Sequence, residues 1–231
     1  MRSVSEQSFR DFEHIVADGA STDNTLDIVR QFPDVIVHSE RDSGIYDGMN
    51  QGLRLARGRY LLFLNAGDTF PDSGTLQLYA DAIASGNADI IYGDTDIVDG
   101  SGRFLRHRHL SAPALLTRES FRRGMLICHQ AFMVRRAIAP AYDMRYAFSA
   151  DYDWTIRCIE ATEPGRCVNL HAIVAHYLDE GATEKHKLRS LRERMLVMAE
   201  HYGWWRTIGA HLSFIPRAIM RKIGLKRKRS L

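Results

Sequence analysis

The sequence predicts an α/β fold in which helices flank a mostly parallel β-sheet. Short apolar runs of strand length alternate with helical segments of about 10–15 residues, which is the arrangement of βαβ units. Polar turn residues follow several of these runs, and the sequence contains neither repeats nor low-complexity segments. Its 231 residues suffice for one large domain with an appendage, or for two small domains.

The most informative segment is the apolar run at residues 60–64 and the turn after it. Five consecutive apolar residues after Gly58 are too few for a buried helix and are typical of a strand covered on both faces. The run ends in Asn65, Gly67 and Asp68. Because ligands of open α/β sheets bind beyond the carboxyl ends of strands, Asp68 is placed where chemistry takes place. An Asx-turn after a core strand is the alternative interpretation.

The other elements follow from apolar spacing and from the residues that end each run. Residues 3–12 indicate the end of a helix and a connection. Glycines at the ends of helical patterns, such as Gly58 and Gly86, are typical stops. Strands are expected at residues 13–17, 35–37, 60–64, 88–92 and within 126–134, with a hairpin at 95–98 and 104–107 and a last strand at 168–177. Helices are expected at residues 21–31, 46–57, 71–85, 149–161 and 185–202.

Composition limits the class of protein and its compartment. The chain carries 45% hydrophobic and 26% charged residues, which is ordinary for a soluble globular protein. Three cysteines without CxxC spacing indicate neither a disulfide framework nor a zinc site, and they favour a reducing compartment. No signal peptide and no membrane-spanning run are recognised. We therefore expect a cytoplasmic protein, with peripheral attachment to the inner face of the cell membrane as an option.

The C-terminal segment is strongly basic. After Glu200 the sequence contains eight basic residues and no acidic residue, although the net charge of the whole chain is only +3. Aromatic residues and an apolar stripe accompany these charges, as in helices that bind an anionic membrane surface. No nucleic-acid partner is expected because no nucleic-acid-binding motif accompanies the charge. A disordered basic end is the other interpretation.

Four segments in this order resemble the family 2 glycosyltransferases, and within them the small bacterial enzymes of polysaccharide assembly. They are residues 13–25 (EHIVADGASTDNT), 40–52 (ERDSGIYDGMNQG), 60–68 (YLLFLNAGD) and 149–157 (SADYDWTIR). The resemblance implies the GT-A fold over residues 1–184, followed by C-terminal helices with the basic tail at 185–231. It also implies sugar transfer with inversion, from a nucleotide-diphosphate sugar to a saccharide or lipid-linked saccharide acceptor.

The resemblance implies a role for two acids in particular. Asp68 matches the last acid of the family's Asp-X-Asp-type motif and would hold Mg²⁺ or Mn²⁺, which neutralises the leaving diphosphate. Asn65 and Gly67 stand where many relatives have further acids, so the metal site would have one protein carboxylate. Asp151 matches the family's catalytic base, with Ala150 in place of a Glu. A helix cap at Ser149 or Asp151 is the alternative.

Further site residues follow from the same resemblance, and each has a structural alternative. His176 is a candidate metal or phosphate contact, although a lone histidine more often makes a structural hydrogen bond. His129 and Gln130 resemble an acceptor-side pair, and Asp153 is either a partner of the site or a first-turn acid of the helix. The residues expected on the nucleotide-sugar side are Asp18, Asp23, Asp42, Tyr46, Asp47, Asn50 and Asn65.

One departure from the family pattern concerns the N-terminal end of the sequence. Relatives begin with an apolar strand and a Pro-x-Tyr-Asn turn that contacts the nucleotide base, and no segment here matches either. We expect a central sheet that lacks this strand and leaves ladder hydrogen bonds unpaired. Two explanations compete: a start codon that is assigned too late, or a degenerate copy with weak donor binding. The second would favour an inactive glycosyltransferase-like binding domain. A nucleotidyltransferase with a similar sheet and metal is a separate alternative, which the absence of a Gly-rich phosphate loop disfavours.

Overall fold

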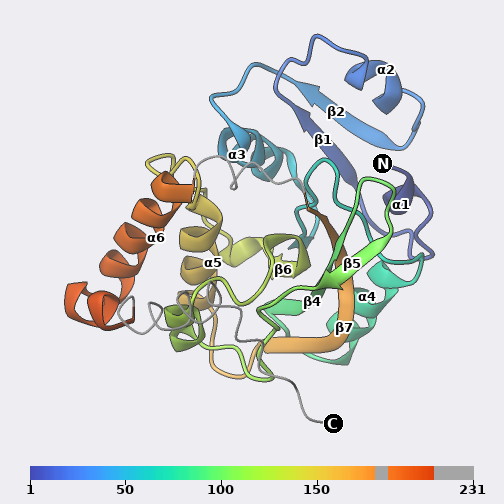
Figure 1. The fold of residues 1–231 in the computed structure, drawn as a ribbon. Helices are drawn as coiled ribbons and strands as arrows, with labels where there is room; N and C mark the ends of the chain where they lie inside the picture. Colours follow the sequence, from blue (N-terminus) through green and yellow to red (C-terminus); the bar gives the residue numbers. More distant parts are fainter. Residues whose placement is uncertain (180–186, 211–231) are drawn as a thin grey trace.

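Two β-sheets organise the chain in the computed structural model, which describes residues 1–179 and 187–210 (Figure 1). In the smaller sheet, β1 (His14–Asp18) pairs in parallel with β2 (Val35–Ser39). The larger sheet is built around the nine-residue strand β4 (Ile90–Val98). One edge of β4 pairs with β5 (Phe104–His107) and β6 (Phe132–Arg135), and β7 (Cys167–Leu178) pairs with β4 in parallel.

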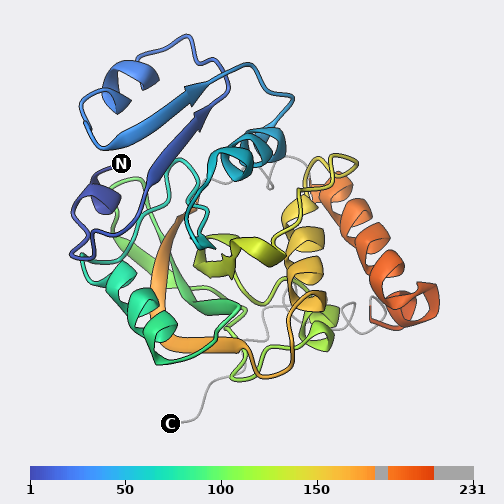
Figure 2. The ribbon, with the colours of Figure 1, turned by 180° about the vertical axis from the view of Figure 1, so that it is seen from behind.

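The helices lie between and outside these strands. The connection between β1 and β2 contains α2, and α3 lies against β1, while α5 and α6 are side by side, with α5 next to β6 of the larger sheet (Figures 1 and 2). The α-helices are α1 (Arg2–Ser5), α2 (Thr25–Val29), α3 (Ile45–Leu55), α4 (Thr75–Ser85), α5 (Ala150–Glu160) and α6 (Lys187–Tyr202). Short 3-10 helices are η1 (Arg118–Arg123), η2 (His129–Ala131) and η3 (Arg136–Ile138).

The predicted α/β class is confirmed, but the larger sheet is mixed rather than mostly parallel. β4 pairs antiparallel with both β5 and β6, and β3 (Tyr60–Leu61) pairs antiparallel with β6. The β4–β5 hairpin has Gly102 at φ 80°, a left-handed conformation that glycine adopts without strain. Sequence patterns gave no direction for β6, because a buried apolar strand looks the same in either orientation.

The strand predicted at residues 60–64 is shorter in the structure. Only Tyr60 and Leu61 form β3, and the apolar residues 62–64 continue the run in half-buried, irregular backbone. β3 has a ladder partner along one edge only, and β1 likewise pairs only with β2. Among the described residues no strand joins these two, so the run has nothing to extend its ladder against. Where one central sheet with a missing strand was expected, the described residues therefore form two separate sheets.

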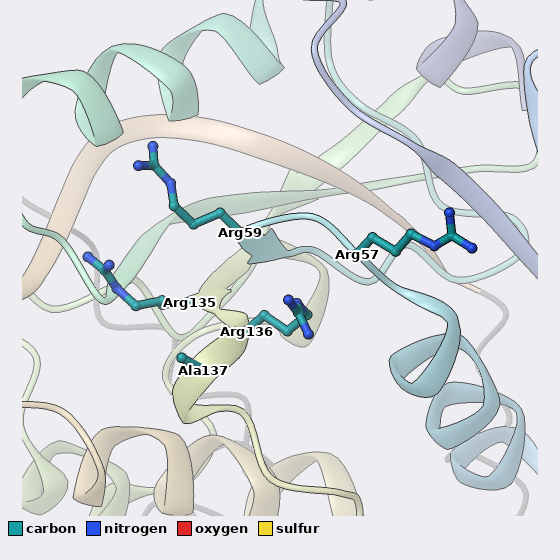
Figure 3. A pocket seen from close by; sticks show the side chains of 5 residues that line it. All are labelled: Arg57, Arg59, Arg135, Arg136 and Ala137. Atoms are coloured by element: carbon teal, nitrogen blue, oxygen red, sulfur yellow. The ribbon is translucent and has the colours of Figure 1, made fainter.

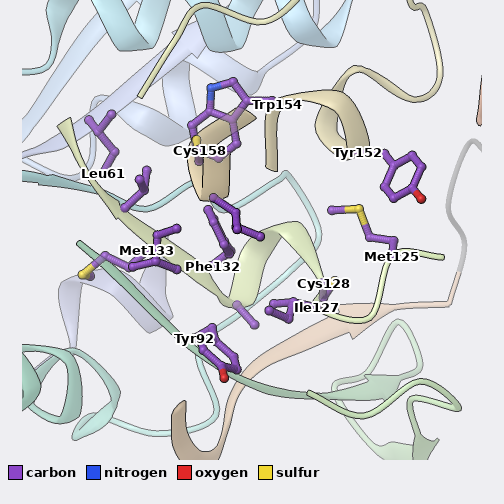
Figure 4. Close-up of a cluster of buried hydrophobic side chains, with 14 of the residues drawn as sticks. Leu61, Tyr92, Met125, Ile127, Cys128, Phe132, Met133, Tyr152, Trp154 and Cys158 are labelled. Carbon is purple, nitrogen blue, oxygen red and sulfur yellow. The ribbon is translucent and has the colours of Figure 1, made fainter. Parts of the chain in front are cut away.

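The core lies between the larger sheet and helices α3, α4, α5 and α6. Trp154 on α5 is fully buried and packs edge-on against Phe132 of β6 (Figure 4). Its indole N–H donates to the carbonyl of Pro140 at 2.6 Å, which satisfies the one polar atom of the ring. A buried ring of this size contributes several kcal/mol, and truncation to alanine costs about 3–5 kcal/mol. Trp154 thereby fixes α5, which carries the predicted base.

Helix α6 shares this core with the rest of the fold. Val197, Met198 and Tyr202 are buried in the same apolar cluster as Trp154, and residues 204–210 form a further helical segment. The predicted division at residue 184 and most of the predicted basic tail fall on residues 180–186 and 211–231, outside the described residues, and remain predictions.

Candidate active site

Asp68 lies at the end of a tight turn that the sequence builds after β3. Its backbone N–H donates to the carbonyl of Asn65, and Gly67 takes a positive φ of 95°. A side chain at Gly67 would also come within 2.9 Å of Leu178, so glycine is required there for two reasons. The turn directs Asp68 toward β7, where its Oδ1 accepts a hydrogen bond from the Leu178 N–H at 2.9 Å.

The surroundings of Asp68 make its carboxyl unusually easy to protonate. The side chain is 8% exposed, and burial raises the pKa of Asp68 to about 6, although two donated hydrogen bonds oppose the shift. At neutral pH the group is therefore still an anion, in a place where few water molecules screen it. A cation brought to this carboxylate would interact with it more strongly than with a surface acid.

Gln130 provides the second hydrogen bond to Asp68. Its Nε2 donates to Asp68 Oδ2 at 2.6 Å, and its Oε1 accepts from the Cys128 thiol at 2.9 Å. All three residues are buried. Because the thiol is the donor to Oε1, the amide is oriented with its N–H₂ group toward the carboxylate. The structure thus places Gln130, predicted on the acceptor side, directly beside the predicted metal ligand.

Asp151 occupies the first turn of α5, where a helix dipole stabilises negative charge. The Tyr46 hydroxyl on α3 donates to its Oδ1 at 3.0 Å. Ser149 precedes this helix, but its side chain makes no capping hydrogen bond, so the alternative of a side-chain cap at Ser149 is wrong. Asp151 does accept from the neighbouring Tyr152 N–H at 2.9 Å, and it is half-buried.

A cluster of aromatic rings connects the surroundings of the two acids. Tyr142 stacks between Tyr46 and Trp154, with ring centroids 5.7 and 4.9 Å away. Its hydroxyl lies 2.6 Å from His129 Nε2, and His129 immediately precedes Gln130. Burial raises the pKa of Tyr177, and the nearby charges of both Asp68 and Asp151 raise it further. Asp68 and Asp151, 83 positions apart in the sequence, are thus joined by a chain of contacts that runs through Gln130, His129, Tyr142 and Tyr46.

His129 is neutral in this cluster. Burial lowers the pKa of His129 to about 4, and its Nδ1 has no hydrogen-bond partner among the described residues. A neutral ring that is enclosed by Phe63, Tyr142 and Trp154 makes a packing contribution. Its predicted role on the acceptor side stays a prediction.

Of the four aspartates predicted on the nucleotide side, Asp18 ends β1, Asp23 and Asp42 lie in the loops after β1 and β2, and Asp47 lies in the first turn of α3. Asp18 accepts from the Ser39 hydroxyl at 2.6 Å and from the Ser21 N–H, and these bonds lower the pKa of Asp18. The carboxylates of Asp23, Asp42 and Asp47 each accept a backbone N–H in their own loop.

Asp42 and Gly19 are in close contact. A Cβ at Gly19 would lie 2.7 Å from Asp42 Oδ2, so this glycine lets the loop after β1 approach the loop before α3. The predicted nucleotide-side acids Asp18 and Asp42 are thereby brought to one end of the smaller sheet.

Asn50 has a clear structural role. Its side-chain amide is buried and forms a pair of hydrogen bonds with the backbone of Tyr142, at 3.1 and 2.7 Å. These bonds hold the loop that carries Tyr142 against α3. For Asn65 the structure gives a backbone contribution to the turn at Asp68. Contacts of either residue with a nucleotide stay predictions.

Asp153 is part of the connection between two helices. Its oxygens accept from Arg157 Nε at 2.7 Å and from His201 Nε2 at 2.9 Å, and the side chain is buried. Both oxygens are therefore occupied by partners within the protein. His176, the other predicted ligand, forms backbone hydrogen bonds with Thr69, which places it beside the turn that carries Asp68.

The side chains around Asp68 fit a cation that brings further ligands with it, such as diphosphate oxygens and water. Residues 1–179 and 187–210 contain no group of three or more His, Cys, Asp or Glu side chains arranged to hold a metal. Asp68 offers one carboxylate, and Mg²⁺ accepts one or two carboxylates together with phosphate oxygens and water. The donor set is suited to a metal bound jointly with a diphosphate.

Two residues of this region were missed by sequence reasoning. Cys128 orients Gln130, and Tyr142 connects Tyr46, Trp154 and His129. The position of Cys128, two residues before Gln130, was a usable signal. For Tyr142 no sequence signal existed, because its role depends on contacts with separate elements, Tyr46 on α3 and Trp154 on α5.

Comparison with known proteins decides the family. Residues 1–142, more than half of the chain, match the family described as Glycosyl transferase family 2. The chain belongs to glycosyl transferase family 2. This glycosyltransferase is 37% identical over 190 residues to the PGL/p-HBAD biosynthesis glycosyltransferase of Mycobacterium tuberculosis, which covers 78% of this chain and 70% of the relative. It is therefore a transferase enzyme, and the nucleotidyltransferase alternative is set aside.

Solved structures share the fold of this glycosyltransferase. S. aureus TarS 1-349 in complex with UDP-GlcNAc superposes with a TM-score of 0.69 at 17% identity, covering 98% of this chain and 71% of TarS. The mannosyltransferase PcManGT from Pyrobaculum calidifontis, in complex with GDP-Man and Mn²⁺, gives a TM-score of 0.57 at 14% identity, covering 96% and 73%. These likenesses confirm the predicted GT-A fold.

No helix within the described parts of the glycosyltransferase, 1–179 and 187–210, has the length and apolar character required to cross a bilayer.

Proposed function

We propose that this glycosyltransferase moves a sugar from a nucleotide-diphosphate sugar to an acceptor hydroxyl, with inversion at the anomeric carbon. The observation that carries the proposal is the chain of contacts from Asp68 through Gln130, His129, Tyr142 and Tyr46 to Asp151, while the rings of Tyr46, Tyr142 and Trp154 order the surroundings of Asp151. Inversion by direct displacement needs one base for the acceptor and stabilisation of the leaving group on the opposite side.

Asp151 is proposed as the base. The acceptor O–H would donate its proton to an Asp151 oxygen while the acceptor oxygen forms a bond to the anomeric carbon. The bond from that carbon to the diphosphate oxygen breaks, and its electron pair leaves with the diphosphate. The hydrogen bond from Tyr46 holds the carboxylate in one orientation, which keeps the other oxygen available for the acceptor.

Asp68 is proposed to hold Mg²⁺ or Mn²⁺ together with the donor diphosphate. When bound, such a cation supplies charge neutralisation for the leaving phosphate oxygens. The chain's own contribution is an orientated, poorly solvated carboxylate, fixed by Leu178 N–H and by Gln130. His176 lies beside this turn and is proposed as a second contact to the phosphate side.

The nucleotide is proposed to bind at the loops that carry Asp18 and Asp42. Two solved structures that share the fold are complexes with UDP-GlcNAc and with GDP-Man, which supports a nucleotide sugar as donor. Acidic residues with free lone pairs can accept hydrogen bonds from the base or from ribose hydroxyls. The acceptor is proposed to be a saccharide or a lipid-linked saccharide, since relatives in sequence are biosynthesis glycosyltransferases.

Attachment to an anionic membrane surface would suit a lipid-linked acceptor. The eight basic residues after Glu200 support this part of the proposal.

The proposed chemistry is tested by donor turnover. The full chain is incubated with a panel of nucleotide sugars, with and without Mn²⁺, and free nucleoside diphosphate is measured. We expect slow metal-dependent hydrolysis for at least one donor, a loss of at least a hundredfold for Asp151→Asn and for Asp68→Asn, and no effect for the exposed control Asp27→Asn. Turnover that survives both active-site substitutions would contradict the assignment.

A further inference from the structure

Because β3 and β6 are antiparallel, the start of each strand lies beside the end of the other, and the pair has two ends. At one end, the start of β6 and the chain after β3 bring Gln130 to Asp68. At the opposite end, the start of β3 and the end of β6 meet, with Tyr60 paired to Arg135. This second end holds a hollow of about 410 Å³ lined by Arg57, Arg59, Arg135, Arg136 and Ala137 (Figure 3). A volume of this size is in the range of small-ligand sites.

The arginines of this hollow, here the arginine hollow, fall into two pairs. Figure 3 shows Arg59 and Arg135 extending to one side of β3, and Arg57 and Arg136 to the other. Arg59 and Arg135 both lie over the Tyr60 ring, 5.4 and 5.5 Å from its centroid. The Tyr60 ring holds Arg59 and Arg135 near the strand, and the Arg136 Nε–H, which donates to the Gly58 carbonyl at 2.9 Å, holds Arg136 there.

The acids near the arginine hollow are already occupied. Asp89 forms ion pairs with Arg135 at 2.6 Å and with Arg166 at 3.5 Å. Glu13 Oε1 accepts the backbone N–H groups of Arg57 and Gly58, at 2.5 and 2.7 Å. Within residues 1–179 and 187–210, the guanidinium groups of Arg57 and Arg59 form no ion pair with a carboxylate. Of these four arginines only Arg135 has an acidic partner among the described residues, so one positive charge of the Arg59/Arg135 pair and both of the Arg57/Arg136 pair have none.

We propose that the arginine hollow is a binding site for an anion that carries at least two phosphoryl groups. Guanidinium groups match phosphate oxygens with two parallel N–H···O bonds. Three guanidiniums without an acidic partner, spread over both sides of the strand, favour a ligand with more than one phosphoryl charge. The hollow lies at the end of β6 remote from Gln130, so its ligand is distinct from the donor at Asp68.

The phosphoryl groups have two possible sources, a free diphosphate or phospholipid head groups gathered at the site. Inorganic pyrophosphate represents the first source. A dihexanoyl phosphatidylinositol phosphate, which carries a phosphodiester and a phosphomonoester and is kept below its micelle concentration, represents the second. Both probes are titrated into the full chain by calorimetry in EDTA, so that a divalent cation cannot recruit them to Asp68. The probe that binds with the higher affinity identifies the source of the phosphoryl groups.

The test variant is the double substitution Arg57→Gln with Arg59→Gln. Both side chains are exposed, and the backbone N–H of Arg57 that Glu13 binds is retained, so folding is expected to be unchanged. The matched control is Arg30→Gln with Arg103→Gln, which removes the same charge from exposed positions elsewhere. Asp68→Asn is the control for the candidate active site.

For the preferred probe we expect at least tenfold weaker binding in the Arg57/Arg59 double variant and less than a twofold change in the Arg30/Arg103 control. Asp68→Asn should bind the probe as the unaltered chain does. Raising the salt concentration should weaken binding to the unaltered chain, because the attraction is electrostatic. Absence of binding for both probes, or equal affinities in the two double variants, would overturn the proposal.

Discussion

Asp68 combines two properties that make the enzyme sensitive to pH. Its folded pKa of about 6 lies above the ordinary value of 3.8, so between these values the folded state binds more protons than the unfolded state. The contribution of Asp68 to stability is therefore greatest at low pH and declines as pH rises from about 4 to about 6, by about 1–3 kcal/mol. A proton and a cation also compete for the same carboxylate.

We therefore predict that Mn²⁺ affinity, measured together with a nucleoside diphosphate, increases as pH rises through about 6. Urea unfolding between pH 4 and 7 should show a smaller pH dependence in Asp68→Asn than in the unaltered chain. Asp27→Asn, an exposed acid, is the control and should follow the unaltered chain. A cation affinity that is constant between pH 5 and 7 would contradict a role of Asp68 as ligand.

Tyr46 provides a second prediction at the scale of single residues. Tyr46→Phe removes the hydrogen bond to Asp151 but keeps the ring that stacks on Tyr142. A hydrogen bond to a charged group is worth about 1.5–3 kcal/mol, so we expect kcat to fall about tenfold or more and the free energy of unfolding to fall by no more than this amount. Donor turnover and thermal unfolding are measured together. Unchanged kcat would show that Asp151 needs no orientation by Tyr46.

Cys128 allows the orientation of Gln130 to be tested without touching either acid. Cys128→Ser keeps a donor to Gln130 Oε1, whereas Cys128→Ala removes it. We expect the alanine variant to require about three- to tenfold more Mn²⁺ for half-maximal turnover, and the serine variant to restore the original requirement. Equal requirements in both variants would show that the thiol is simply packed in the core.

Single residues also show how far sequence reasoning reaches. Asp68 and Asp151 could be predicted as site residues because Asp68 follows a recognisable strand, Asp151 begins a recognisable helix, and both segments resemble family motifs. Asn50 and Asp153 were selected by the same patterns, yet their side chains bind Tyr142, Arg157 and His201 within the protein. Sequence position determines that a polar residue is near a site, but its partners depend on loops that come from elsewhere in the chain.

At the scale of elements, the pair of α5 and α6 is connected by one buried ionic cluster. His201 on α6 contacts both Asp153 and Glu160 of α5. Burial alone would lower the pKa of His201, but its hydrogen bond to Asp153 and the negative charge of Glu160 raise that pKa above the usual 6.5. The stabilisation is fully present below about pH 6.5 and is lost as pH rises through the higher folded pKa.

We predict that His201→Gln lowers the free energy of unfolding by about 1–2 kcal/mol at pH 6, and by less at pH 9. Urea unfolding at both pH values measures the difference. His107→Gln is the matched control, because the His107 ion pair with Asp96 is mostly exposed on the histidine side and should contribute little. A loss that is equal at pH 6 and pH 9 would show that the charge of His201 is not involved.

Element boundaries illustrate a further limit of sequence reasoning. The helices at α3, α4 and α5 were predicted to within a few residues, because apolar spacing and glycine stops are local signals. β3 was predicted with five residues and has two. The apolar content of residues 60–64 predicts that they are buried, whereas the length of the strand depends on a ladder partner that the local sequence cannot specify.

At the scale of the whole molecule, the α/β class was predictable, but the division into two sheets required coordinates. Patterns along the chain do not show that β4 pairs with β5, β6 and β7 while β1 pairs with β2 alone. The same applies to the arginine hollow. Its arginines come from two segments, 57–59 and 135–136, which only the antiparallel pairing of β3 with β6 brings together.

The C-terminal region supplies the prediction for the molecule as a whole. Tyr202 and Thr207 are buried, so the fold extends to this part of the chain, whereas Trp205 is 89% exposed. All but one of the eight basic residues after Glu200 lie in the sequence after Ala210. A chain that ends at Ala210 should therefore keep its stability and donor turnover but lose binding to anionic vesicles, since each basic residue near such a surface contributes about 1 kcal/mol.

Co-sedimentation with phosphatidylglycerol-containing vesicles measures this binding, with neutral phosphatidylcholine vesicles as the control. Trp205→Ser in the full chain tests whether the exposed indole inserts at the interface, because tryptophan favours the head-group level. The expected order of pelleting is the full chain first, then the Trp205 variant, then the chain that ends at Ala210. Equal pelleting of all three would remove the membrane from the proposed partners, and the basic segment would then need another anionic ligand to account for its charge.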